Sequence, residues 1–289
     1  MVRKGMVNGM AIASNATREA LGTCEPCIKG KHARRDIEKM TQTRANSILG
    51  RVYSDLCGPM QTRSRSGYNH FATFVDDKSQ KVFIHGLKLK SDLQEKLTEF
   101  VASTELETGQ RLKVLRTDGG GEYTGERTQK YLHEHGIKHK MTTADTPQHN
   151  GVAECMNRTL IETACTLLLD AGLPHSFWFE AVQYAAYLHN ITPTCSLDQD
   201  ITPEEAWSGN KPNVTLVHVF GCKAHVHIPE KRGQKLDAKS LECIFLGYAQ
   251  NRRAYRLLHR PSGHTFESHD VIFDEGGERK HYIRKTPPC

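Results

Sequence analysis

The sequence predicts a mixed α/β domain followed by a small antiparallel β-barrel, and three observations support this fold class. Short β-rich runs over residues 47–57, 67–77 and 80–89 come first. Strand and helix patterns then alternate as far as residue 190, the order expected for a mixed sheet covered by helices. From residue 214 to about residue 275 the chain returns to short β-rich runs separated by turns, which is typical of a small barrel.

The elements of the first domain are predicted from hydrophobic periodicity and from end signals. The runs 67–77 and 80–89 are joined by polar residues and predict an antiparallel hairpin. Ser91 and Gln94 have capping-box spacing, so we expect a helix from there to Gly109. The further predicted elements are a strand ending at Val114 and Leu115, a helix from about Gly125 to His135, a strand over residues 137–141, and helices over residues 151–171 and 176–190.

Three prolines interrupt this pattern after the last of these helices. Pro193, Pro203 and Pro212 follow one another closely, so a domain boundary is expected near residues 205–215. The β-rich runs expected to form the barrel are residues 216–222, 224–228, 241–248, 254–258 and 264–273.

Charge and hydropathy limit the class of partner. The 289 residues carry a formal net charge of +6, and residues 1–54, with ten Lys or Arg and four Asp or Glu, account for all of it. A basic segment on a neutral body favours a phosphate-backbone partner, although a solvated basic linker is the alternative. No apolar run approaches the ~18 residues that cross a membrane, and no signal-peptide pattern opens the chain. We expect an intracellular protein, cytoplasmic and nuclear, without a membrane partner or a small-molecule substrate.

Three acidic residues stand where predicted elements begin or end. Asp118 follows a short apolar strand and precedes three glycines, which places it at the strand's carboxyl end. Glu154 lies in the first turn of the helix over residues 151–171, and 35 residues separate it from Asp118. Asp55 lies near the end of the first predicted strand. Three carboxylates placed in this way can converge on a metal ion.

These acids and the residues around them resemble the D,D-35-E triad of retroviral and retrotransposon integrases, and in detail the copia-type branch. The resemblance covers nearly the whole chain. The matched motifs are Ser54-Asp55-Leu56-Cys57-Gly58-Pro59, Phe74-Val75-Asp76-Asp77, Thr117-Asp118-Gly119-Gly120, Thr146-Pro147-Gln148 and Asn150-Gly151-Val152-Ala153-Glu154.

The resemblance implies a fold for each part of the chain. It implies a ribonuclease-H-like catalytic core over residues 41–208 and a Src-homology-3-like β-barrel over residues 214–277. A truncated zinc-binding remnant over residues 1–40 and a basic tail over residues 278–289 complete the expected domains.

The resemblance further implies a polynucleotidyl transferase that processes DNA 3′ ends and joins them to target DNA. Asp55, Asp118 and Glu154 would hold Mg²⁺ or Mn²⁺, two ions per site, with Asp55 bridging both. Paired ions stabilise charge on the attacking and the leaving oxygen, and carboxylates suit hard cations. Without metal the three acids repel one another, so their pKa values should rise. Two nearby acids are expected to be structural instead, Glu122 at a helix start and Asp77 in a turn.

Basic and amide side chains near the acids are expected to hold DNA. The predicted contacts are Asn150, Asn157, Arg158, Lys138 and Lys140, with His139 between the two lysines. The barrel arginines, which could contact phosphates or serve only solubility, are Arg252, Arg253, Arg256 and Arg260. The resemblance implies element ends and target DNA as partners, and a homo-oligomer acting on two ends.

Two cysteines near the N-terminus have the spacing of zinc ligands. Cys24 and Cys27 would supply two ligands of the four that a closed site needs, and His32 follows too closely. Related integrases place two histidines before such cysteines, and none precedes Cys24, so we expect the chain to begin inside the module and not to bind Zn²⁺. This truncation, with Cys155 and Cys165 where relatives often carry arginine, leaves open an inactive or domesticated nucleic-acid-binding relic.

Overall fold

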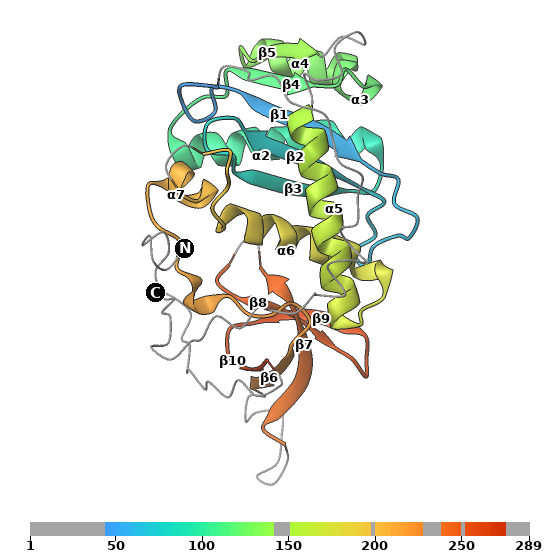
Figure 1. Ribbon diagram of the computed structural model, residues 1–289. Coiled ribbons are helices and arrows are strands. Elements are labelled where there is room, and N and C mark those ends of the chain that lie inside the picture. Colours follow the sequence, from blue (N-terminus) through green and yellow to red (C-terminus); the bar gives the residue numbers. More distant parts are fainter. Residues whose placement is uncertain (1–43, 142–150, 198–199, 228–237, 250–251, 276–289) are drawn as a thin grey trace.

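The computed structural model describes most of the two predicted domains. It describes residues 44–141, 151–197, 200–227, 238–249 and 252–275 (Figure 1). These residues contain a five-stranded mixed sheet and a five-stranded antiparallel sheet. The predicted zinc-binding remnant and basic tail lie outside the described residues.

The mixed sheet has the strand order β3-β2-β1-β4-β5. β1 pairs antiparallel with β2 and β2 antiparallel with β3, which confirms the predicted hairpin. β4 lies parallel to β1, and β5 lies parallel to β4. The bounds are β1 (Val52–Cys57), β2 (His70–Asp76), β3 (Val82–Leu87), β4 (Val114–Thr117) and β5 (Lys138–Met141).

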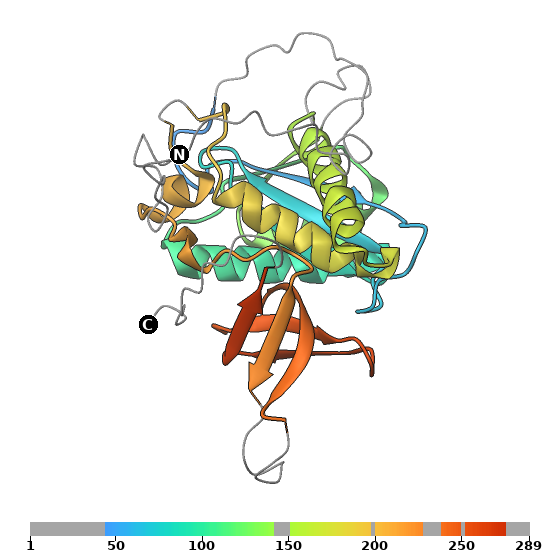
Figure 2. The same cartoon turned by 60° about the horizontal axis from the view of Figure 1, so that its bottom comes forward.

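Helices cover both faces of this sheet, as Figure 2 shows. Side chains of α2 and α4 pack on one face, where Phe74 and Leu115 lie, while α5 and α6 pack on the other against Tyr53 and Phe71. Strand alternation separates the two sets, because successive residues of β1 point to opposite faces. The helices are α2 (Leu93–Thr108), α3 (Gly121–Thr124), α4 (Glu126–Glu134), α5 (Gly151–Ala171), α6 (Trp178–Asn190) and α7 (Pro203–Ser208).

Two predicted starts are wrong. The first strand begins at Val52 instead of residue 47, because Leu49 adopts a left-handed conformation (φ 56°) and its N–H donates to Asp76 Oδ1 at 2.8 Å. The capping box at Ser91 does not form. Instead, the Asp92 carboxylate accepts from the N–H groups of Lys88 and Leu89, at 3.1 and 3.0 Å, and α2 begins directly after Asp92, at Leu93.

The second sheet is antiparallel throughout, with the order β10-β6-β7-β8-β9. Two expectations about it are corrected. Residues 216–222 are no strand, because a 3₁₀ turn over Val214–Leu216 ends with Val217 N–H donating to the Val214 carbonyl at 3.2 Å, and Gly221 is left-handed (φ 79°). Residues 264–273 form two strands, divided where the Asp270 carbonyl accepts from His227 N–H at 3.1 Å. The bounds are β6 (Lys223–His227), β7 (Ser240–Tyr248), β8 (Tyr255–His259), β9 (His264–Ser268) and β10 (Val271–Asp274).

The barrel packs against α6, so the buried side chains of both domains form one hydrophobic cluster (Figure 1). Tyr184 of α6 stands at its centre, with its ring against Phe245 and its hydroxyl donating to the His218 carbonyl. At the far end of α5, Ala171 approaches Gly221 so closely that a Cβ on the glycine would lie 2.2 Å from the alanine Cβ. The two domains are therefore in direct contact along α6 and at the end of α5.

A buried carboxylate reinforces this contact. Glu180 of α6 is 1% exposed, and its Oε1 accepts from Ser66 Oγ at 3.3 Å and lies 3.5 Å from a guanidinium nitrogen of Arg256 on β8. No helix within the described part of the chain has the length and apolar character needed to cross a lipid bilayer.

Candidate active site

The three predicted acids lie at one end of the mixed sheet. Asp55 is on β1, and Asp118 directly follows β4. Because β1 and β4 are parallel and pair Val52 with Leu115, continuing the register aligns Asp55 with Asp118. Glu154 lies in the first turn of α5, which packs across β1 and β2.

The electrostatics of Asp55 link the three acids. The pKa of Asp55 is raised to about 6, chiefly by burial and next by the charge of Asp118. Hydrogen bonds from Asn157 and from the Leu56 N–H lower this pKa and only partly offset the rise, and Glu154 adds a smaller upward effect. The pKa of Asp55 is thus raised, with burial as the main cause and repulsion from the other two acids as a contribution.

Asn157 is a partner of Asp55 instead of the predicted DNA contact. Its side chain is buried, its Nδ2 donates to Asp55 Oδ2 at 2.8 Å, and its Oδ1 accepts from Thr73 Oγ1. Both ends of the amide are used inside the protein, so the prediction of a DNA contact is corrected. The sequence feature that could have indicated this role is the position of Asn157 three residues after Glu154, which places both residues on one side of the helix.

A glycine turn shapes the position of Asp118. Its Oδ1 accepts from Gly120 N–H at 3.0 Å, and Gly119 adopts φ 80°, a conformation that glycine favours. The neighbouring acids lie in the kinds of element that the sequence predicts for them. Glu122 lies in α3, and Asp77, in the turn after β2, pairs with Arg51 at 3.4 Å.

The donor chemistry fits a hard divalent cation. Asp55, Asp118 and Glu154 offer only carboxylate oxygens, and no Lys or Arg is among the groups that shift Asp55. Within the described ranges, however, no group of three or more His, Cys, Asp or Glu side chains is close enough to hold one ion. Three like charges without a cation oppose closer approach.

The exposed basic residues near the acids lie on one side of the sheet. Lys138 and Lys140 of β5 are exposed, and the register pairs Arg116 with Lys140 and Tyr53 with Arg116. Alternation therefore places both lysines on the Asp55 face. Arg158 is exposed on α5. Asn150, Cys24 and Cys27 lie outside the described residues.

Two of the predicted barrel arginines have partners within the protein. Arg256 pairs with Glu180, and Arg252 pairs with Glu267. Arg256 therefore joins the barrel to α6, and the two alternatives given for the barrel arginines stay open.

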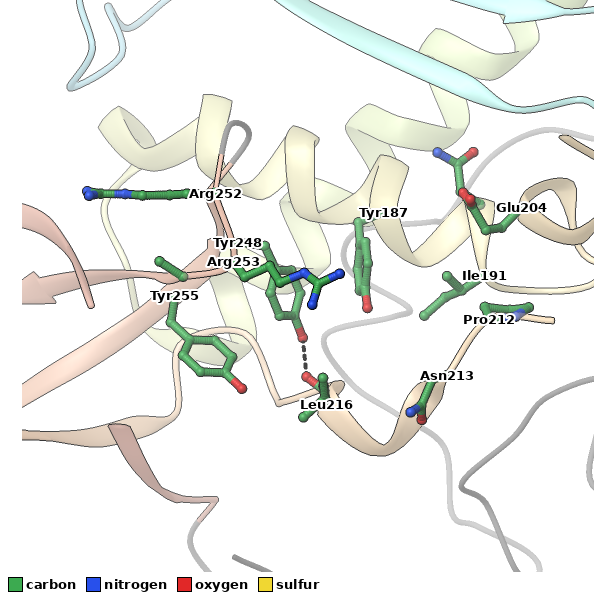
Figure 3. A pocket seen from close by; sticks show the side chains of 12 residues that line it. Tyr187, Ile191, Glu204, Pro212, Asn213, Leu216, Tyr248, Arg252, Arg253 and Tyr255 are labelled. Atoms are coloured by element: carbon green, nitrogen blue, oxygen red, sulfur yellow. Dashed lines mark hydrogen bonds between the residues drawn. The ribbon is translucent and has the colours of Figure 1, made fainter. Parts of the chain in front are cut away.

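A cavity of about 390 Å³ lies at the junction of the two domains and not at the acids (Figure 3). Tyr187, Tyr248 and Tyr255 line it together with Leu216 and Arg253. The Tyr248 hydroxyl donates to the Leu216 carbonyl at 2.6 Å, so this hydroxyl already has a hydrogen-bond acceptor within the cavity wall. The cavity is thus separate from the three acids at the end of the mixed sheet.

Comparison with protein families identifies both domains. The family described as "Integrase core domain" matches residues 48–147, and the "Retroviral polymerase SH3-like domain" matches residues 222–286. The mixed sheet is therefore the ribonuclease-H-like core that the motifs implied, and the antiparallel sheet is the Src-homology-3-like barrel.

Similar proteins come from plant transposons. The retrovirus-related Pol polyprotein from transposon TNT 1-94 of Nicotiana tabacum is 42% identical over 269 residues, which are 93% of this chain and 20% of that protein. Those from transposons RE2 and RE1 of Arabidopsis thaliana are each 32% identical over 88% of this chain and 17% of their own lengths. The chain thus spans about a fifth of the length of these relatives.

Among solved structures, a chain of the simian T-cell lymphotropic virus intasome in complex with the PP2A regulatory subunit B56 gamma aligns with a TM-score of 0.48 and 17% identity, covering 81% of each chain. The two domain families occur in the predicted order, and the Pol relatives align over most of the chain. The chain therefore belongs to the copia-type integrases of retrovirus-related Pol polyproteins.

Proposed function

We propose that this chain processes the 3′ ends of a linear DNA and joins them to target DNA. Residues 41–208 form the catalytic core in this proposal, and residues 214–277 form the barrel domain. The observation that carries the proposal is the placement of the acids, with Asp55 aligned beside Asp118 at the end of the mixed sheet and Glu154 on the first turn of α5; burial and the charges of Asp118 and Glu154 raise the pKa of Asp55. Such an uncompensated group of acids at the end of an integrase-type sheet suits a divalent-cation site.

Each residue near this site has a role in the proposed reaction. Asp55, Asp118 and Glu154 would hold two Mg²⁺ or Mn²⁺ ions, which supply charge stabilisation at the attacking and leaving oxygens. Asn157 orients the Asp55 carboxylate through its 2.8 Å hydrogen bond. The exposed lysines of β5 contact DNA phosphates on the same face.

The proposed reaction consists of two in-line displacements at phosphorus. In processing, a water oxygen bonds to phosphorus as the bond from phosphorus to the 3′ oxygen breaks, which frees a 3′ hydroxyl. In strand transfer, that hydroxyl attacks a target phosphate and displaces the target 3′ oxygen, so one phosphodiester bond forms as another breaks. A homo-oligomer would hold the two DNA ends for concerted joining.

A strand-transfer assay tests this proposal. The chain is incubated with terminal-repeat oligonucleotides and Mg²⁺, beside the variants Asp55→Asn, Asp118→Asn and Glu154→Gln. Joined products are expected from the unsubstituted chain and from the control Glu122→Gln, whose acid lies in α3. Equal activity in all variants, or products formed in EDTA, would contradict the proposal.

The second candidate is a nucleic-acid-binding relic without activity. Two points favour it: the described acids are not grouped closely enough to hold one ion, and Cys155 stands beside Glu154 where the family resemblance implies arginine. The same assay separates the candidates, because a relic would bind the oligonucleotides at equal affinity with and without Mg²⁺ and would give no joined product.

A further inference from the structure

A series of largely buried hydrogen bonds leads away from the Asp118 turn. The hydroxyl of Thr117, the last residue of β4, accepts from Gly119 N–H at 3.2 Å. The same oxygen lies 3.0 Å from Nε2 of His139 on β5. Thr117 is fully buried, so these bonds do not compete with bulk water.

The partner on the other side of the ring fixes the direction of these bonds. Gln129 Nε2 lies 2.8 Å from His139 Nδ1, and an amide nitrogen only donates. His139 Nδ1 therefore accepts, and in the neutral ring Nε2 carries the proton and donates to Thr117. Burial lowers the pKa of His139, which favours this neutral form.

The series continues to the strand that carries Asp55. Gln129 Nε2 also donates to the carbonyl of Tyr123 at 2.8 Å, and the Tyr123 hydroxyl lies 2.6 Å from Ser54 Oγ. Tyr123 and Ser54 are both fully buried. Ser54 directly precedes Asp55, just as Thr117 directly precedes Asp118. One network thus joins the backbone positions next to both acids.

The network adds to limited strand pairing between the two strands that carry the acids. All four residues of β4 pair with β5, but only two of them pair with β1. Three glycines follow Asp118, and glycine restricts the backbone least of all residues. A rigid imidazole with an acceptor on one edge and a donor on the other spans the gap between α4 and β4.

We propose that His139 is a positioning residue, which fixes the Asp118 turn relative to Asp55 through Thr117 and through the Gln129–Tyr123–Ser54 series. It contacts neither acid itself. This inference rests on the proposed role of the two acids, but the frame also acts in the metal-free protein. Outer partners of this kind typically change metal affinity by about 10–100-fold when they are lost.

Amide hydrogen exchange of the metal-free protein tests the frame directly. In His139→Phe, amide exchange at Gly119 and Gly120 should be faster by about tenfold, since the hydrogen bond that His139 donates to Thr117 is lost. The control His133→Phe, an exposed histidine of α4, should leave both rates unchanged. The Phe245 amide, which donates to the Cys222 carbonyl in the barrel, reports any global loss of stability.

Two further measurements separate positioning from general damage. Nitrogen chemical shifts of His139 should report the tautomer protonated at Nε2. Mg²⁺ affinity measured by calorimetry should fall about tenfold in His139→Phe. His139→Gln, whose amide can both accept and donate, should recover most of it. Gln129→Met serves as a second variant if His139→Phe does not fold, with the same expected changes.

Three results would overturn the inference: a tautomer protonated at Nδ1, unchanged exchange at Gly119, or faster exchange at Gly119 and Phe245 alike. Faster exchange at Gly119 alone, in a chain that binds no Mg²⁺, would support the frame and contradict the proposed function instead.

Discussion

The end of the sheet that carries the acids and the junction with the barrel are stabilised in opposite ways. At the acid end, Asp55 is buried beside two other carboxylates, and polar hydrogen bonds hold its surroundings. At the junction, the rings of Tyr184, Phe245 and Tyr248 pack together, and a buried acid, Glu180, has a guanidinium partner. The junction therefore stabilises the fold, whereas the acid end contains repulsion that protonation or a bound cation would relieve.

The largest expected effect comes from removing charge at the acid end. Asp55→Asn should lower the strand-transfer rate by about 10³-fold or more, because the carboxylate proposed to bridge the ions loses its charge. The fold should remain, since the asparagine oxygen still accepts from Asn157. Rates from single-turnover joining assays, with circular dichroism as the fold check, give the measurement. A loss below tenfold would contradict a metal-bridging role.

A substitution at the junction should instead lower the stability of the fold. Tyr184→Ala should lower the free energy of unfolding by about 3–5 kcal/mol, because a large ring leaves the shared core. Tyr184→Phe keeps the ring and loses one hydrogen bond to the His218 carbonyl, so it should cost only about 1 kcal/mol. Urea unfolding measures both. Loss of joining activity in Tyr184→Phe at unchanged stability would contradict the view that the junction serves stability and the acid end serves activity.

The pH dependence of stability should reveal the repulsion at Asp55. Its pKa is raised to about 6, so between about pH 4 and pH 6 the folded state binds more protons than the unfolded state. Protonated Asp55 adds roughly 2–3 kcal/mol to the free energy of unfolding, relative to the charged form at high pH. This added stability is complete below about pH 4 and is lost as pH rises through 6. Metal-free unfolding of the unsubstituted chain and of Asp55→Asn should therefore diverge across this window. Parallel curves would rule out the raised pKa.

The smallest effect is expected from the exposed lysines of β5. Lys138→Ala and Lys140→Ala should each weaken DNA binding regardless of sequence and reduce the salt slope by about one. Lys130→Ala, an exposed lysine of α4, is the matched control. Fluorescence anisotropy between low and moderate salt measures the slope. An equal change in the control would mean that only net charge matters.

The fold was predictable where local signals and packing agree. The helix over residues 151–171 has the predicted bounds, because strong apolar periodicity follows an Asn-Gly pair. α7 was missed because Pro203 was interpreted as an interruption. It occupies the first turn of the helix, where proline is favoured, and Thr202 Oγ1 caps that turn by accepting from Glu205 N–H at 3.1 Å. Residues 216–222 look like a strand, but the 3₁₀ turn over Val214–Leu216 and the left-handed Gly221 determine their path.

The candidate site was predictable only in its acids. Their motifs and spacing are local in sequence, so the sequence identifies Asp55, Asp118 and Glu154. The partners depend on register and on burial. Asn157 was expected to face DNA, and only the packing of α5 on β1 turns it towards Asp55. His139 was noted only as a neighbour of two lysines, because nothing local shows that it faces Thr117.

The α5 helix has a consequence for how Glu154 is placed. Its 21 residues form a rod of about 31 Å. Glu154 lies on the first turn, and Ala171 on the last turn contacts Gly221, where there is no room even for a methyl group. Along its length α5 packs on α6, β1 and β2, and its last turn contacts the barrel at Gly221. The direction of the helix, and with it the position of Glu154, is therefore set mainly by the domain of the mixed sheet, while the contact at Gly221 limits how closely the barrel can approach the other end of the helix.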